Sequence, residues 1–178
     1  MNSEPPVSRR AVLYVLEKSV LAKKLLFVLS LCLLPAWFCQ TELLADSQRM
    51  AVLVYHHIQH KVTSDVSCTP EQFIEHMQAL LDAGFRPLTL AQTRRFLAGT
   101  LSVDKPVLIT FDDGYASLHQ FALPVARRFR MPMTVFMITS RAGRRIQFAE
   151  YLTERQIKEM ADSGFFDFGS HTHDLHTD

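Results

Sequence analysis

Short apolar runs alternate with amphipathic segments from about residue 50 to the end of the chain. Four runs have the length and composition of strands: 51–55, 107–111, 133–138 and 165–169. The first, Ala-Val-Leu-Val-Tyr, is apolar at every position, which is typical of a strand buried on both faces. Helical segments separate the runs, and repeated strand–helix units predict a parallel sheet or barrel with helices outside it.

Helix start and stop signals define those segments. Thr69 with Gln72, and Thr153 with Gln156, have the spacing of a capping box. Pro70 suits a first helical position, and Gly84 and Gly164 are the expected stops. Two further helices are predicted at 88–97 and 118–130, the second kinked or started late by Pro124.

The N-terminal segment has a different pattern. Residues 25–38 carry no charge over fourteen positions, and Pro35 interrupts them. Residues 1–24 hold five basic and two acidic side chains: Arg9, Arg10, Lys18, Lys23 and Lys24 against Glu4 and Glu17. A basic stretch before a short apolar core predicts an export signal. An uncleaved membrane anchor and a buried helix are the alternatives, and we assign 1–46 to this segment and 47–178 to the domain that follows it.

Composition limits the partners. Among 178 residues the formal net charge is +1, so the chain lacks the basic excess that nucleic-acid binding requires. Cys32 and Cys39 lie in or beside the N-terminal apolar run, which leaves Cys68 alone in the body. An internal disulfide framework is therefore not expected, nor is a structural zinc site with paired cysteines.

Two polar clusters follow predicted strands. Asp112 and Asp113, followed by Gly114, come directly after the strand at 107–111. One carboxylate can bind a metal ion while the other acts as a base, although Asp-Gly is also a common turn pair. The second cluster is Ser170-His171-Thr172-His173-Asp174-Leu175-His176. Three histidines at one strand end suit metal binding better than packing, with a surface histidine run as the alternative.

Together the clusters supply one carboxylate and two imidazoles, with open positions for water and substrate. This is the make-up of a catalytic metal site. A divalent ion would acidify a bound water, and the second aspartate would accept its proton. An iron oxygenase site has the same ligand types, but the strand–helix alternation argues against that class.

The motifs Thr110-Phe111-Asp112-Asp113-Gly114 and Ser170-His171-Thr172 resemble those of the polysaccharide deacetylase (NodB-like) family, carbohydrate esterase family four. The resemblance begins at Val52-Leu53-Val54-Tyr55-His56-His57-Ile58 and extends to the last residues. It implies an α/β fold: the N-terminal portion of a distorted (β/α) barrel with parallel strands. The N-terminal signal or anchor helix predicted from the charge pattern would precede this barrel. It also implies a hydrolase that removes N-acetyl groups from an N-acetylglucosamine polymer through a metal-activated water.

Site roles follow from the matching positions. Asp112 matches the catalytic base, Asp113 the metal-binding carboxylate and His171 the first metal histidine. For the third ligand we favour His176, because its five-residue spacing resembles that of deacetylases of β-1,6-linked poly-N-acetylglucosamine; His173 is the competing candidate. Zinc is the expected ion, with cobalt, nickel or iron as alternatives.

We expect the chain to be exported and to be periplasmic, extracellular or anchored at the cell envelope. The family's later motifs, including the general acid, fall beyond Asp178, so the chain resembles a first half of the barrel and a non-catalytic glycan-binding protein is the alternative. Other charged residues are predicted to be solvated: Arg127, Arg128, Arg141, Arg144 and Arg145.

Overall fold

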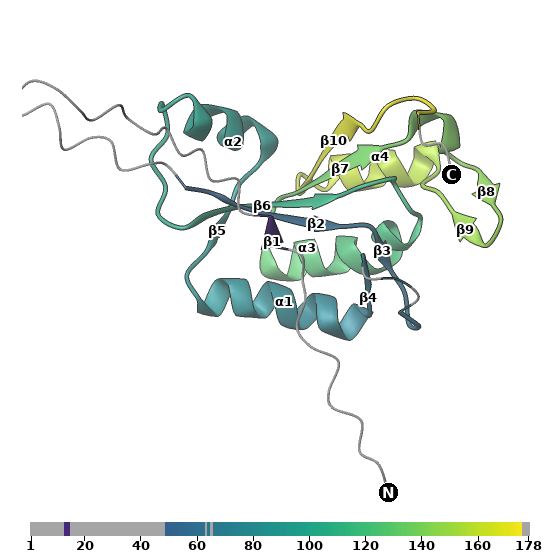
Figure 1. The fold of residues 1–178 in the computed structure, drawn as a ribbon, viewed down its shortest axis with the longest axis horizontal. Coiled ribbons are helices and arrows are strands. Elements are labelled where there is room, and N and C mark those ends of the chain that lie inside the picture. The colour runs from purple at the N-terminus through teal and green to yellow at the C-terminus, as the bar shows by residue number, and fades with distance from the viewer. Residues whose placement is uncertain (1–12, 15–48, 63, 65, 176–178) are drawn as a thin grey trace, which may run out of the picture.

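A twisted, mainly parallel sheet forms the centre of the computed structural model, which describes residues 13–14, 49–62, 64 and 66–175 (Figure 1). The four longer strands pair with one another in parallel: β2 (Ala51–Tyr55), β6 (Pro106–Phe111), β7 (Met133–Met137) and β10 (Phe166–Ser170). The strand order is β1-β2-β6-β7-β10, with β1 (Leu13–Tyr14) antiparallel to β2 and β5 (Arg86–Pro87) parallel to β6. The four predicted strands and their parallel arrangement are confirmed.

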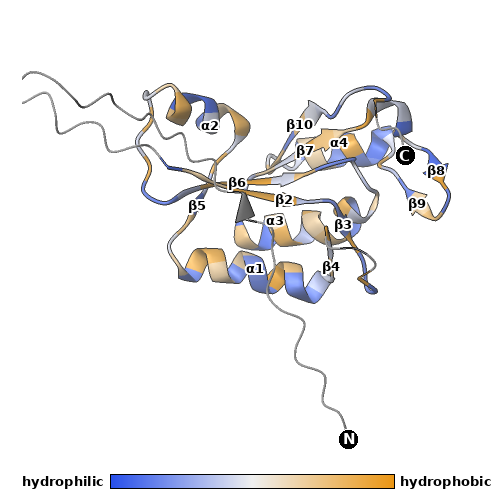
Figure 2. Cartoon of the chain, viewed as in Figure 1, coloured by the Kyte–Doolittle hydropathy of each residue, from blue (hydrophilic) through white to orange (hydrophobic). Residues whose placement is uncertain are grey.

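Helices connect the strands, and apolar and polar residues are mixed along them (Figure 2). They are α1 (Pro70–Asp82), α2 (Leu90–Leu97), the π-helix η1 (Leu118–Ala122), α3 (Leu123–Phe129), the short 3-10 turn η2 (Thr139–Arg141) and α4 (Glu154–Asp162). Pro124 lies at the start of α3, so the predicted late start is confirmed, with a π turn before it. Two small strand pairs, β3 (His57–Ile58) with β4 (Ser67–Cys68) and β8 (Arg145–Ile146) with β9 (Ala149–Glu150), were not predicted.

The core contains side chains of the sheet and of the helices α1 and α3. Phe73 of α1 and Phe111 of β6 are fully buried. The Phe73 ring packs edge-on against the Tyr55 ring, with 5.2 Å between the ring centroids. Every residue of β6 is buried, as a central strand of a parallel sheet requires. In β2, however, only Leu53 and Tyr55 are buried, so the prediction of burial on both faces is wrong for that strand.

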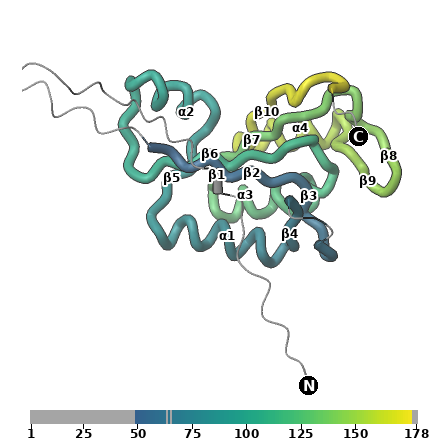
Figure 3. Tube along the Cα trace, viewed as in Figure 1, coloured from purple at the N-terminus to yellow at the C-terminus, as the bar shows by residue number. Residues whose placement is uncertain are grey.

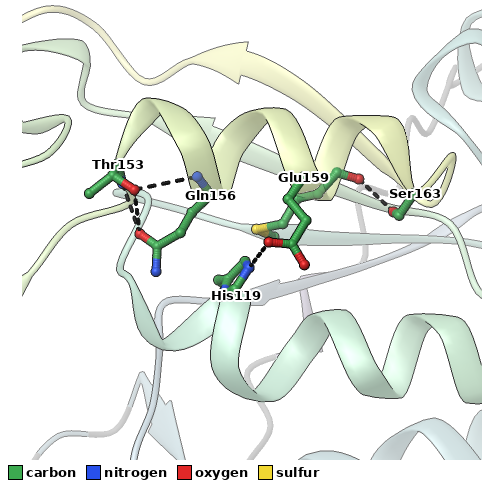
Figure 4. Close-up of polar contacts among 6 residues, drawn as sticks. His119, Thr153, Gln156, Glu159 and Ser163 are labelled. Carbon is green, nitrogen blue, oxygen red and sulfur yellow. Dashed lines mark hydrogen bonds and ion pairs between the residues drawn. The ribbon is translucent and has the colours of Figure 1, made fainter.

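Helix α4 shows how the capping signals position an element (Figure 4). The Thr153 side chain accepts a hydrogen bond from the backbone N–H of Gln156, and the Gln156 side chain accepts one from the backbone N–H of Thr153. His119 of η1 contacts Glu159 at 2.9 Å and connects α4 to η1. The helix therefore begins where the sequence predicted, directly after Thr153.

The N-terminal prediction falls mostly outside the described residues. Leu13 and Tyr14 are the exception, and the backbone of this pair forms β1, a strand that the sequence did not predict. Within the described part of the chain, no helix is both long and apolar enough to cross a membrane. The predicted signal or anchor helix, and the boundary at residue 46, remain predictions.

Candidate functional site

Asp112 and Asp113 lie in a tight turn at the carboxyl end of β6. The backbone N–H of Asp112 still donates to the Tyr55 carbonyl, at 2.9 Å, so the sheet pairing continues to this residue. Asp113 then adopts a left-handed conformation with φ of 68°, which aspartate tolerates better than most residues. The turn buries Asp113, which is only 5% exposed, and leaves Asp112 partly exposed.

Gly114 is required by this turn. Its φ of 82° lies in the region that favours glycine, and a Cβ atom there would come within 3.1 Å of the Met137 side chain. The Asp-Gly pair is therefore a turn, as the simpler alternative proposed. The same turn also fixes a buried carboxylate at a strand end, so the turn and a functional role are compatible.

His171 reaches the same edge from β10. Its backbone N–H donates to the Met137 carbonyl of β7 at 2.7 Å, and the N–H of Ile138 donates to the Asp113 carbonyl at 3.3 Å. The end of β7 thus joins the turn after β6 to the loop after β10, and Figure 3 shows the last part of the trace running beside the segment that follows β7. Parallel strands place their carboxyl ends at one edge, which is where loops of such sheets carry binding sites.

The two predicted ligands are close together. Asp113 Oδ1 lies 3.9 Å from His171 Nε2, and the His171 side chain is 31% exposed. Two atoms that each lie about 2.0–2.2 Å from one zinc ion are at most roughly 4.4 Å apart, so this separation is compatible with a shared ion. The donor types, carboxylate oxygen and imidazole nitrogen, also fit zinc.

The third ligand is not placed. His176 lies outside the described residues, and within 13–14, 49–62, 64 and 66–175 no three His, Cys, Asp or Glu side chains converge as a metal-binding group. The structure therefore brings two predicted ligands together and leaves His176 a prediction.

His173, the competing ligand, has another contact. Its Nδ1 lies 2.9 Å from Thr139 Oγ1, and the backbone N–H of Ser140 donates to the His173 carbonyl at 3.1 Å. Ser140 also donates to Asp174 through its hydroxyl, at 3.3 Å. His173 and Asp174 thus attach the loop after β10 to η2, which positions the chain around His171.

Tyr115 and Tyr151 were missed by sequence reasoning. Tyr115 stacks between His57 and Tyr151, and its ring centroid lies 4.6 Å from that of His57 and 5.1 Å from that of Tyr151. Burial, followed by the nearby Asp113 carboxylate and the Tyr151 hydroxyl, raises the pKa of Tyr115 above its ordinary value. Burial lowers the pKa of His57, so this ring favours the neutral form.

Arg141 corrects a prediction. It was expected to be a solvated charge, but its side chain is half-buried and donates from Nη1 to the Tyr151 hydroxyl at 2.9 Å. The guanidinium carbon also lies 5.6 Å from the centre of the Tyr151 ring. No sequence pattern links Arg141 to Tyr151, because the turn that joins them depends on tertiary contacts.

Two surface hollows lie near the site without including it. One is lined by residues of α3 and α4, among them Arg127, Arg155 and Lys158. The other lies beside β8 and β9 and includes Arg144, Glu150 and Tyr151. Neither is lined by Asp112, Asp113 or His171.

The sequence that contains this site matches a known protein family. Residues 102–178, which hold both clusters, match the model of the family described as polysaccharide deacetylase. This chain carries a polysaccharide deacetylase domain. The comparison thus confirms the resemblance drawn from the two motifs.

Related deacetylase sequences and structures extend the match toward the N-terminus. The protein YxkH of Bacillus subtilis (strain 168) is 37% identical over 127 residues, which are 71% of this chain and 43% of that protein. A poly-beta-1,6-N-acetyl-D-glucosamine N-deacetylase of Staphylococcus epidermidis is 32% identical, over 65% of this chain and 40% of its own length. The structure of IcaB from Ammonifex degensii superposes with a TM-score of 0.67 at 34% identity, over 71% of this chain and 54% of that chain.

The deacetylase match has a defined extent. The chain spans about two fifths of the length of the curated relatives that it matches. The α/β fold with its parallel sheet is shared with the IcaB structure.

Proposed function

We propose that this chain provides the metal-binding part of a hydrolase that removes N-acetyl groups from an N-acetylglucosamine polymer. The observation that carries the proposal is the approach of Asp113 and His171 to 3.9 Å at the carboxyl edge of the sheet, one residue from Asp112. The sheet of this chain would then be the first part of a distorted (β/α) barrel.

Each residue of the site has a separate role in this proposal. Asp113, His171 and His176 would hold a divalent ion, zinc by preference. A bound ion would polarise the acetyl carbonyl and lower the pKa of a water molecule. Asp112 is partly exposed beside the buried Asp113, so it is the carboxylate that can accept the proton of the attacking water.

The substrate class rests on the relatives and on charge. The Staphylococcus epidermidis relative is named as acting on poly-beta-1,6-N-acetyl-D-glucosamine, an uncharged polymer before deacetylation. The formal net charge of this chain is +1, which does not oppose a neutral substrate. We infer export to the cell envelope from the basic and apolar pattern of residues 1–38 and from the location that such a polymer requires.

Acetate release tests the proposal. The full chain is incubated with β-1,6-linked N-acetylglucosamine oligomers, with zinc or with a chelator, and free acetate is measured. We expect release that requires zinc and that falls at least about 100-fold in Asp112→Asn, because a general base contributes about 10²–10⁴-fold.

The matched control is Asp104→Asn, which changes an exposed carboxylate in the loop before β6. It should release acetate like the unmodified chain. A folded chain that binds zinc and releases no acetate would contradict hydrolysis by this chain and favour the non-catalytic glycan-binding alternative.

A further inference from the structure

The segment that follows β7 contacts both parts of the proposed metal site. The backbone N–H of Ile138 donates to the Asp113 carbonyl at 3.3 Å. The backbone N–H of Thr139 donates to the Thr172 carbonyl at 3.2 Å, in the loop that follows His171. Two consecutive residues thus connect the turn after β6 to the loop after β10.

The side chains of η2 hold the same loop further along. Thr139 Oγ1 lies 2.9 Å from His173 Nδ1, and the Ser140 hydroxyl donates to Asp174 Oδ1 at 3.3 Å. The backbone N–H of Ser140 also donates to the His173 carbonyl at 3.1 Å. Thr139 and Ser140 therefore contact the loop through both their backbones and their side chains.

The loop has a backbone conformation that requires such support. Thr172, directly after His171, has a φ of 73°, in the left-handed region. This region is unfavourable for a β-branched residue, which keeps it only where the surrounding structure imposes it. The hydrogen bond from the Thr139 N–H to the Thr172 carbonyl is one of the contacts that impose it. The direction of the chain after His171 thus depends on η2.

We propose that Thr139 and Ser140 are positioning residues that keep the loop after β10 in the conformation that binds metal. The inference rests on the proposed metal site. A loop that is already ordered loses less conformational entropy when a ligand binds, and a larger fraction of chains is ready to bind, so the apparent affinity is higher. Through these two residues the short turn η2 contributes to metal binding without holding the ion itself.

Zinc affinity of the full chain tests the inference. The dissociation constant is measured by competition with a chromophoric chelator, for the unmodified chain, Thr139→Val and Thr139→Ser. Valine keeps the branched shape and lacks the oxygen that contacts His173. We expect zinc binding about 2–10-fold weaker in Thr139→Val, the usual value of one hydrogen bond. Thr139→Ser retains the oxygen and should bind zinc like the unmodified chain.

A second variant and a matched control accompany this measurement. Ser140→Ala removes the contact with Asp174 and should weaken zinc binding in the same direction. The control is Thr100→Val, which also removes an exposed threonine hydroxyl, but one that donates to the Arg95 carbonyl at 3.1 Å, at the end of α2. Zinc affinity in the control should be unchanged. The midpoint of thermal unfolding, measured without metal, shows that each variant is folded.

The possible results separate the two proposals. If the unmodified chain binds no zinc, the metal site itself is contradicted and the positioning role with it. If the unmodified chain binds zinc and folded Thr139→Val or Ser140→Ala binds it equally well, the role of that residue is overturned and the metal site stands. An equal loss in Thr139→Val and Thr139→Ser would exclude the hydroxyl contact as the cause. Should Thr139→Val fail to fold, Ser140→Ala decides the question.

Discussion

Among single residues, the histidines after β10 differ in what they contact. His171 Nε2 faces Asp113 Oδ1 at 3.9 Å, whereas His173 Nδ1 lies 2.9 Å from the Thr139 hydroxyl. We expect His171→Ala to abolish stoichiometric zinc binding, because it removes a ligand. His173→Ala should reduce affinity by roughly tenfold or less, since it removes only a contact that positions the loop. Bound zinc per chain after gel filtration is the measurement.

The same assay decides between the candidates for the third ligand. His176→Ala should lose zinc as His171→Ala does, and His60→Ala, which changes an exposed histidine between β3 and β4, should retain it. Loss of zinc in His173→Ala together with full retention in His176→Ala would show that the preferred ligand is wrong.

At the level of strands, Gly169 is tightly confined. It pairs with Phe136 of β7, and a Cβ atom on Gly169 would lie 2.8 Å from two carbons of the Phe136 ring. We expect Gly169→Ala to lower the free energy of unfolding by about 1–3 kcal/mol, the usual cost of overpacking. Urea denaturation measures this change.

A double variant provides the control for Gly169. In a Phe136→Ala background the ring is absent, so adding Gly169→Ala should cost much less than it does alone. Equal costs in both backgrounds would exclude the ring as the cause of the destabilisation.

Helix α4 allows a test of the capping signal. The side chains of Thr153 and Gln156 satisfy two backbone N–H groups at the start of this helix. We expect Thr153→Ala to reduce the free energy of unfolding by about 1 kcal/mol, measured by urea denaturation. Thr153→Ser keeps the accepting oxygen and should cost less than half as much; an equal loss would mean that the hydroxyl does not act as a cap.

Elements with strong local signals could be predicted from the sequence, and those formed by tertiary contacts could not. The capping boxes at Thr69 and Thr153 gave correct helix starts, because cap and partner are three residues apart. In contrast, β5 contains only Arg86 and Pro87 and exists through pairing with β6. Partial exposure of β2 likewise depends on which helices cover the sheet, a property that the apolar run at 51–55 does not encode.

For the whole molecule, the site was predictable where its residues follow strands. Asp113 and His171 are 58 positions apart, but each lies just after the carboxyl end of a parallel strand. Because parallel strands end at the same edge of a sheet, the two side chains are brought together. Tyr115, Tyr151 and Arg141 gave no such signal, because the segment that contains Tyr151 and Arg141 joins the site through the bridge between Tyr115 and Tyr151. Contacts between segments so far apart in the sequence can be identified only in the folded arrangement.

Stability of the whole domain should depend on pH through half-buried histidines. Burial lowers the pKa of His76 and of His57, and for His76 the nearby Glu75 opposes the shift. A folded pKa below the unfolded value of about 6.5 means that the unfolded chain binds protons first. The contribution of these histidines to stability is therefore fully present above about pH 6.5 and is lost as pH falls through the folded pKa.

We expect the thermal unfolding midpoint to decrease between pH 7.5 and 5.5, and to decrease less in His76→Asn. His60→Asn changes an exposed side chain and should keep the pH dependence of the unmodified chain; an identical slope in His76→Asn would show that this histidine does not contribute.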